Sequence, residues 1–370
     1  MIEQIDPNLT NVENARRLGV SETTIRRWKA KANRPDPSLS EVDSFFTDLP
    51  SGIITSRGRS VRLADGSWEK ATWKPNAKAL ADTLTYDDLE RAIAGFRSPS
   101  APLVPQGRQT AILNAADLQI GKACQRGGGT PETLARCMQS FHTFAEYIRA
   151  TGPSAVVLVD NGDPIENVWN TPSQLVTNDL DVPAQIRTFR RLMIEGLKLL
   201  APLVQDFTML SVPSNHGAAR VGYKSPGGTV DADFGLEISH QLEDVCAEAP
   251  GLSHVQFVRP EALDETATIE RSNTKLAFHH GHQSSGPQAH GKWWAAQDHG
   301  RMAGWDADIL VTAHYHSLRL EQSGDGRWII GASSSDAQSD WFTNRTGESA
   351  RQGMTAFDVL DGQWSNLRII

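Results

Sequence analysis

Several apolar segments in the carboxyl-terminal two-thirds of the chain end abruptly in acidic, amide and histidine side chains. The clearest is the Val-rich run 155–159, which follows Gly152-Pro153 and breaks into Gly162 and Asp163. Such a run suits a parallel strand buried on both faces. Ligands bind beyond the carboxyl ends of parallel strands, and carboxylate, amide and imidazole groups together suit Mn, Fe or Zn better than Ca. The sequence therefore predicts a metal site at one edge of a sheet.

Five strand ends contribute to this predicted site. In chain order they are Asp117-Leu118-Gln119, Gly162-Asp163, Asn215-His216, His279-His280-Gly281-His282 and His314-Tyr315-His316. Each group alone is weak evidence for a metal site, because a lone Asp or His at a strand end is usually structural. Their order and placement together make the signal specific.

This order resembles that of the calcineurin-like metallophosphoesterases, over roughly residues 110–320. The resemblance implies that Asp163 bridges two divalent ions. The other implied ligands are Asp117, Gln119 and His316 for the first ion, and Asn215, His280 and His314 for the second. It also implies that His216 protonates or stabilises the leaving oxygen, while Glu166 orients its imidazole.

The implied reaction is hydrolysis of a phosphodiester, which needs neutralising charge, a deprotonated water and help for the leaving oxygen. Two divalent cations about 3.5–4 Å apart can supply the first two, with a bridging hydroxide as the attacking group. We expect two such cofactor ions, with Mn favoured and Fe, Zn or Mg as alternatives.

The chain departs from the family pattern at three positions. Gln119 stands where the family usually has His, and a neutral amide oxygen is a harder and weaker donor that favours Mn or Mg. Some branches of the superfamily resemble this form, so we expect activity to be kept. Ser214 and Ala313 replace the usual glycines. Small residues of this kind are tolerated at such turns unless the backbone needs a positive φ. Among the adjacent histidines His280 is the preferred ligand, because Gly follows it, and His282 is the second candidate.

The elements that must position these residues alternate between strands and helices. We predict strands at 110–116, 155–159, 207–212, 275–278 and 308–312, and helices at about 132–150, 182–200 and 234–247. This pattern of βαβ units, with the resemblance, predicts an α/β fold: a metallophosphoesterase β-sandwich flanked by helices. Its domain is expected to cover residues 108–370.

Two smaller parts precede that domain. Residues 49–107 are expected to form a β-hairpin around Asp65-Gly66, a helix at about 85–96 and a linker. Residues 1–48 contain a predicted helix, a turn at Gly19 and a second helix capped by Ser21, with a short third helix near 39–46.

The spacing of the first two helices resembles the helix-turn-helix DNA-binding motif. Seven Lys or Arg residues and one acid lie between Arg16 and Arg34. In that motif the second helix enters the major groove. The residues expected to contact DNA there are Thr23, Thr24, Arg26, Arg27 and Lys29. The alternative is an amphipathic hairpin whose charges only solvate it.

Composition sets the broad class of the protein. Hydrophobic residues make up 39% of the 370 residues. The formal net charge of −8 argues against a surface that binds nucleic acid nonspecifically. No run approaches the roughly 20 apolar residues of a membrane span. The three cysteines indicate reduced thiols. We expect a cytoplasmic protein without a membrane partner, or one in the host cytoplasm if a phage encodes it. A homo-oligomer is compatible with the sequence.

The helix-turn-helix decides between substrates at this stage, because an attached DNA-binding unit raises the effective concentration of DNA. The leading prediction is a metal-dependent phosphodiesterase or nuclease that cuts DNA, similar to the repair-type and phage-type nucleases of the superfamily. One alternative is a phosphatase or diesterase acting on a small nucleotide or a phosphoprotein. The other is a DNA-binding protein whose phosphoesterase domain has decayed, which the intact set of strand-end residues disfavours.

Overall fold

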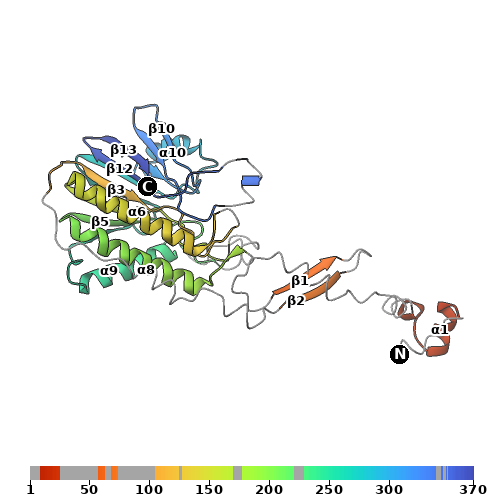
Figure 1. Cartoon of the computed structure of the whole chain (residues 1–370). Coiled ribbons are helices and arrows are strands. Elements are labelled where there is room, and N and C mark those ends of the chain that lie inside the picture. The colour runs from red at the N-terminus through yellow and green to blue at the C-terminus, as the bar shows by residue number, and fades with distance from the viewer. Residues whose placement is uncertain are drawn as a thin grey trace. The chain divides into compact units, whose positions relative to one another are not determined.

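The computed structural model describes most of the chain in two compact units, each treated by itself (Figure 1). The first unit includes residues 9–25 and the backbone of 57–62 and 68–73. The described residues of the second are 105–124, 127–169, 177–220, 229–338, 343–344, 347 and 349–370.

In the first unit, α1 (Asn11–Leu18) is capped at both ends as its sequence predicts. Thr10 and Glu13 form a reciprocal capping box, and Gly19 ends the helix in the left-handed region at φ 67°. The Thr24 amide donates to Ser21 Oγ at 3.2 Å, so Ser21 caps the next helical turn. Ile25 is fully buried. The helix–turn–helical-turn geometry through Ile25 is therefore present.

The hairpin predicted within residues 49–107, around Asp65-Gly66, is confirmed. Strands β1 (Arg57–Arg62) and β2 (Trp68–Trp73) pair antiparallel, with Arg62 opposite Trp68. The helices predicted near 39–46 and 85–96 lie outside the described residues, as do Arg26, Arg27 and Lys29.

The second unit contains two stacked sheets. The larger has the order β13 (Gln363–Ile369), β12 (Thr355–Leu360), β3 (Thr110–Asn114), β4 (Ala155–Asp160), β5 (Phe207–Ser211) and β6 (Gln256–Val258). The smaller has the order β10 (Arg319–Gln322), β11 (Trp328–Gly331), β9 (Ile309–Thr312), β8 (Thr274–His279) and β7 (Thr266–Arg271). Strands β3 to β6 are parallel, as are β8, β9 and β11.

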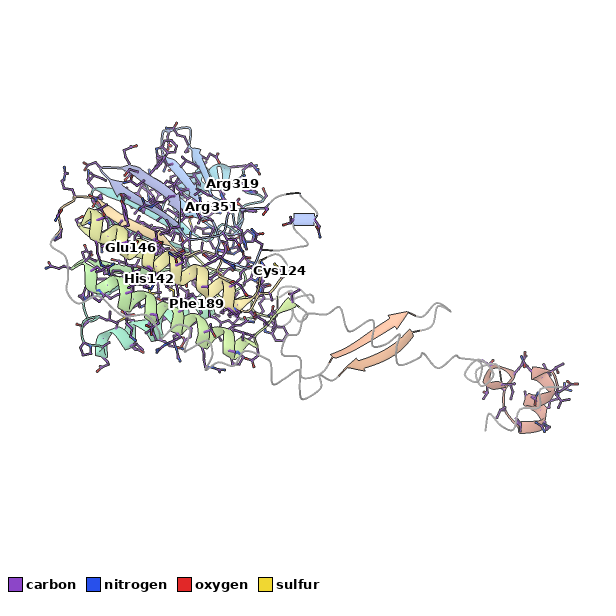
Figure 2. The ribbon with its side chains drawn as sticks, in the orientation of Figure 1. Cys124, His142, Glu146, Phe189, Arg319 and Arg351 are labelled. Carbon is purple, nitrogen blue, oxygen red and sulfur yellow. The ribbon has the colours of Figure 1, made fainter. Side chains whose placement is uncertain are left out.

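Helices cover the outer face of each sheet. On the larger sheet lie α6 (Thr130–Thr151), α8 (Val182–Leu200), which the short helix η2 (Ala201–Leu203) extends, and α9 (Phe234–Glu248). On the smaller sheet lies α10 (His290–Gly300), whose buried Trp294 packs on Ala277 and Leu310. Figure 2 shows Phe189 of α8 among the side chains of the helical layer.

Strand β4 shows why both sheet faces are apolar. Val156 and Leu158 pack in the cluster under the helices, whereas Val157 and Val159 pack between the two sheets. Side chains alternate between the faces of a strand, so a continuous Val-rich run fills both layers.

The predicted fold class, an α/β sandwich of two sheets flanked by helices, is confirmed. The strands and helices predicted between residues 110 and 312 are present, with ends shifted by a few residues at most. Among the described residues, no helix combines the length and the apolar character needed to cross a bilayer.

Candidate metal centre

The carboxyl ends of strands from both sheets converge at one edge of the sandwich. Asp117, Asp163 and Asn215 follow β3, β4 and β5 of the larger sheet, and His280 and His314 follow β8 and β9 of the smaller. Backbone hydrogen bonds join these loops. The Asp117 amide donates to Gly162 O at 3.0 Å, and the Ala313 amide donates to His280 O at 2.9 Å. The His314 amide donates to Asp117 Oδ2 at 2.9 Å and links the loops of the two sheets into one layer.

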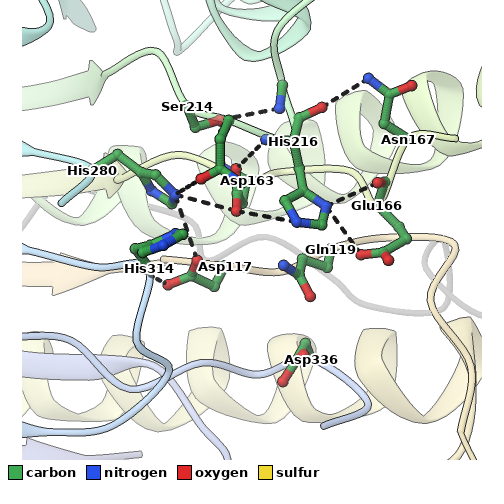
Figure 3. Close-up of polar contacts among 12 residues, drawn as sticks. Asp117, Gln119, Asp163, Glu166, Asn167, Ser214, His216, His280, His314 and Asp336 are labelled. Carbon is green, nitrogen blue, oxygen red and sulfur yellow. Dashed lines mark hydrogen bonds and ion pairs between the residues drawn. The ribbon is translucent and has the colours of Figure 1, made fainter. Parts of the chain in front are cut away.

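Asp163 is the centre of this layer, and it lies between two imidazoles (Figure 3). Its Oδ2 is 3.2 Å from His280 Nε2 and 4.0 Å from His216 Nε2. Its Oδ1 accepts the His216 amide at 2.7 Å, and its own amide donates to Ser214 Oγ at 2.8 Å. Asp163 is 1% exposed. Its carboxylate is thus fixed in place by the loop after β5.

His280 presents one defined nitrogen to the centre. Its Nδ1 donates to the Asn161 carbonyl at 2.9 Å, which leaves Nε2 facing Asp163 and the Asn215 side chain. The Nε2 to Asn215 Oδ1 distance is 3.0 Å. A backbone carbonyl that fixes the tautomer in this way is common for metal-binding histidines.

His314 completes a compact group with Asp163 and His280. One possible ligand atom from each lies within 4.8 Å of the other two. The His314 ring packs edge-on against His280, with centroids 5.2 Å apart, and its amide donates to Asp117 Oδ2 at 2.9 Å.

His316 belongs to a neighbouring group of charges. Its Nε2 lies 3.4 Å from Asp117 Oδ1, and its Nδ1 lies 3.2 Å from Asp336 Oδ2. The Asp336 carboxylate thereby orients the imidazole from the side opposite Asp117. Lys122 also contacts Asp336, and its Nζ donates to Gln119 Oε1 at 2.6 Å.

His216 is held by the loop after β4. Its Nδ1 donates to the Glu166 carbonyl at 2.9 Å and lies 3.3 Å from Glu166 Oε2. Asn167 Nδ2 donates to the His216 carbonyl at 2.8 Å. The imidazole remains 18% exposed on its side chain, so it can meet a ligand that approaches from solvent.

Backbone strain is concentrated in this layer. Of thirteen non-glycine residues with positive φ among those described, five are predicted ligands: Asp117, Gln119, Asp163, His314 and His316. Each such conformation is uncommon outside glycine, and clusters of them mark functional sites. Ser214 and Ala313, which stand where the resemblance expects glycine, do not have positive φ, so neither side chain causes backbone strain there.

Charges in the layer perturb one another strongly. Burial would raise the pKa of Asp163, but His280 and His216 hold it well below its ordinary value. Burial would lower the pKa of His280, but the Asp163 carboxylate raises it to about 9. Burial, followed by the nearby His280, lowers the pKa of His314 to about 3, so its imidazole is neutral and able to bind metal at neutral pH.

Two buried carboxylate oxygens indicate that these residues fit a divalent cation. Asp163 Oδ2 and Asp117 Oδ1 accept no hydrogen bond of good geometry among the described residues, although His280 Nε2 lies 3.2 Å from the first and His316 Nε2 lies 3.4 Å from the second. Unsatisfied buried carboxylate oxygens are costly. A cation held by Asp163, His280 and His314 would satisfy Asp163 Oδ2 with the donor types that Mn, Fe and Zn accept.

The structure brings all seven predicted ligands and both predicted catalytic residues to this edge, and their individual roles remain predictions. His279 instead lies in the core beside Trp293 and pairs with Glu265. His282 also pairs with Glu265 through Nε2, at 3.5 Å, while its ring centroid lies 5.4 Å from that of His280 and 6.3 Å from that of His314. Asp160 accepts the Gly162 amide at the end of β4, in agreement with a structural role.

Two residues of the site, Lys122 and Asp336, were not singled out from the sequence. A signal for Asp336 exists, because it follows the strand-like run 328–331 as the ligands follow theirs. Lys122 comes three residues after Gln119, where the Lys122 amide closes a turn on the Gln119 carbonyl at 3.0 Å.

No protein-family model matches the chain, and no curated protein matches it. Among solved structures, Vps29 from Entamoeba histolytica complexed with zinc aligns with 69% of this chain and 88% of its own, at 12% identity and a TM-score of 0.31. A predicted phosphoesterase from Streptococcus pneumoniae covers 68% of this chain and 83% of its own, at 10% identity and a TM-score of 0.29. A 5'-nucleotidase precursor from Thermus thermophilus covers 70% of this chain and 53% of its own, at 11% identity and a TM-score of 0.30.

Proposed function

We propose that this protein is a metal-dependent phosphoesterase that hydrolyses phosphodiester bonds of DNA. The observation that carries the proposal is the group of Asp163, His280 and His314, with an unsatisfied buried carboxylate oxygen and a partly exposed His216 beside it. A bound divalent ion would supply positive charge for the phosphate and lower the pKa of a water molecule.

The side chains around that group suit the remaining steps of the hydrolysis. His216 faces the centre through Nε2, while Glu166 accepts from Nδ1 and fixes the ring. Burial would lower the pKa of His216, but Asp163 and Glu166 raise it to about 9, which keeps the imidazole protonated at neutral pH. A protonated imidazole can donate its proton to the leaving oxygen.

Support for DNA as the substrate comes from the first unit. The Gly19 turn, the Ser21 cap and the buried Ile25 fit a helix-turn-helix. The basic residues that follow Ile25 in the sequence would then contact phosphates. A separate DNA-binding unit would hold long DNA near the metal centre.

A comparison of substrates tests this proposal. The full chain with Mn²⁺ is expected to cleave linear DNA and bis(p-nitrophenyl) phosphate, and to act more slowly on the monoester p-nitrophenyl phosphate. EDTA should abolish all three activities. Preference for the monoester or for a small nucleotide, with DNA left intact, would support the alternative of a phosphatase or nucleotide diesterase.

A further inference from the structure

Lys122 lies inside the ligand set that the family resemblance assigns to the first of two ions. Its ammonium donates to Gln119 Oε1 at 2.6 Å and pairs with the Asp336 carboxylate. The Lys122 side chain is 14% exposed and that of Asp336 is 2% exposed. The one oxygen that Gln119 could offer to a metal ion therefore already accepts from a cation.

The protein holds this arrangement from several directions. The turn from Gln119 to Lys122 places the two side chains together. Asp336 is fixed because its carbonyl accepts from Arg136 Nη2 at 3.0 Å, and its amide donates to Ser334 Oγ at 2.9 Å. Ser334 Oγ in turn donates to the Asp117 carbonyl at 2.6 Å. Lys122 thus has a built position in the layer.

The two predicted metal positions differ in what they offer a divalent ion. At Asp163, His280 and His314 a buried carboxylate oxygen accepts no hydrogen bond of good geometry and meets only imidazole nitrogens. At Gln119 and His316 the amide oxygen faces an ammonium, and His316 Nδ1 and Lys122 share the same Asp336 carboxylate. A divalent ion between Gln119 and His316 would lie close to the Lys122 ammonium, which carries the same sign of charge, and the Gln119 amide oxygen that would bind the ion already accepts from that ammonium.

Asp117 does not require a second ion. Its Oδ1 accepts no hydrogen bond of good geometry and lies 3.4 Å from His316 Nε2 and 4.0 Å from His280 Nε2. Metal–ligand bonds of about 2.0–2.2 Å to nitrogen and oxygen can span that separation, so one ion beside His280 is within reach of Asp117 as well.

We propose that this centre binds one divalent ion, at Asp163, His280 and His314, and that the Lys122 ammonium takes the place of the second cation. The inference rests on the proposed function, because it assumes that the site is a metal-dependent phosphoesterase centre. Lys122 then supplies a fixed positive charge for a phosphate oxygen. Asp336 and Gln119 position that ammonium.

Metal stoichiometry tests this inference without any activity assay. Apo full-length protein is titrated with Mn²⁺, and free Mn²⁺ is followed by electron paramagnetic resonance. Wild type is expected to bind one equivalent. Lys122→Met keeps the length of the side chain and removes its charge, so a second equivalent should bind, with affinity at least about tenfold tighter than any second equivalent in wild type.

Lys198→Met is the matched control, because Lys198 also pairs with an acid but lies on α8, away from the site. It should keep one equivalent, and circular dichroism should show that both variants fold. Two equivalents of similar affinity in wild type, or a single equivalent in a folded Lys122→Met protein, would refute the inference and leave the proposed function standing. No binding by wild type would refute both.

Discussion

At the scale of single residues, the centre separates groups suited to hold a metal ion from groups suited to move a proton. Asp163, His280 and His314 direct ligand atoms at one another. His216 shares the Asp163 carboxylate but is oriented by Glu166. The two kinds of residue should therefore respond differently to substitution.

His216→Gln should slow turnover without releasing metal. Removal of a general acid costs about 10²–10⁴ in rate when the leaving oxygen is a poor leaving group. A p-nitrophenolate leaving group needs little protonation, so bis(p-nitrophenyl) phosphate should be affected far less than a dinucleotide. Measured kcat values for both substrates, with metal content, check this. Equal losses on the two substrates would mean that His216 does not protonate the leaving oxygen.

Gly162 is a residue where a single methyl group should disturb the centre. Its φ is +90°, and an added Cβ would lie 2.6 Å from His280 Nδ1 and 2.7 Å from Ser214 Cβ. Gly162→Ala should cost about 1–2 kcal/mol of unfolding free energy from backbone strain and about 1–3 kcal/mol from the clash. It should also weaken Mn²⁺ binding.

Gly326→Ala is the control for that substitution. Gly326 has nearly the same φ, +92°, but nothing lies within 4 Å of an added Cβ. Urea denaturation of the two variants separates strain from the clash. If both variants lose the same unfolding free energy and both keep the Mn²⁺ affinity of wild type, the close approach of Gly162 to His280 does not matter for metal binding.

At the scale of elements, the first residue of helix α6 is hydrogen-bonded to Asp179, which lies in the connection between β4 and α8. The Thr130 amide and hydroxyl both donate to Asp179, at 2.6 Å each, and Thr130 Oγ1 accepts the Gly121 amide. Burial raises the pKa of Asp179 to about 6 despite these hydrogen bonds. The start of α6 is therefore sensitive to pH.

The sign of that pH dependence follows from the raised pKa. Folded Asp179 binds a proton more tightly than unfolded Asp179, so its ionisation destabilises the fold as pH rises from about 4 to 6. The stability of Asp179→Asn minus that of wild type should increase by roughly 2–3 kcal/mol between pH 4 and pH 7. Urea denaturation in EDTA at several pH values measures it. A difference independent of pH would show that the pKa is not raised.

The same contact shows what could not be predicted from the sequence. The strand at 155–159 and the helix at 182–200 could be predicted from apolar runs and caps, because these signals are local. The predicted start of α6 near Glu132 was late by two residues, since Thr130 is fixed by Asp179 from a distant loop. Likewise the ligands could be predicted from strand ends, but Lys122 and Asp336 are 214 positions apart and only the fold brings them together.

At the scale of the whole molecule, the proposal assigns DNA binding and catalysis to separate units. With a net charge of −8, the proposed attraction to DNA would have to come mainly from a local basic segment. Contacts with phosphates should therefore depend on the residues that follow Ile25.

A paired substitution tests that assignment. Arg26→Ala with Arg27→Ala should weaken binding to duplex DNA and lower the slope of log K against log salt by about two, because each phosphate contact contributes about 0.9. Turnover of bis(p-nitrophenyl) phosphate should not change. Arg16→Ala with Arg17→Ala removes the same charge from α1 and should have a smaller effect. Equal effects of the two pairs would favour nonspecific charge over a helix-turn-helix.

The central claim is that Asp163 holds a divalent metal ion that drives phosphodiester hydrolysis. Asp160 provides a matched control on the same segment, because it is also buried and acidic but accepts the Gly162 amide and is not part of the Asp163, His280 and His314 group. Burial, followed by the Asp233 carboxylate, raises the pKa of Asp160 well above its ordinary value.

The most direct measurement is Mn²⁺ titration calorimetry of wild type, Asp163→Asn and Asp160→Asn, with bis(p-nitrophenyl) phosphate turnover measured on the same samples. Asp163→Asn should lose more than the roughly 10–100-fold in affinity that follows from loss of an outer partner, and its turnover should disappear. Asp160→Asn should behave as wild type. Undiminished Mn²⁺ binding and turnover in Asp163→Asn would contradict the assignment of the centre.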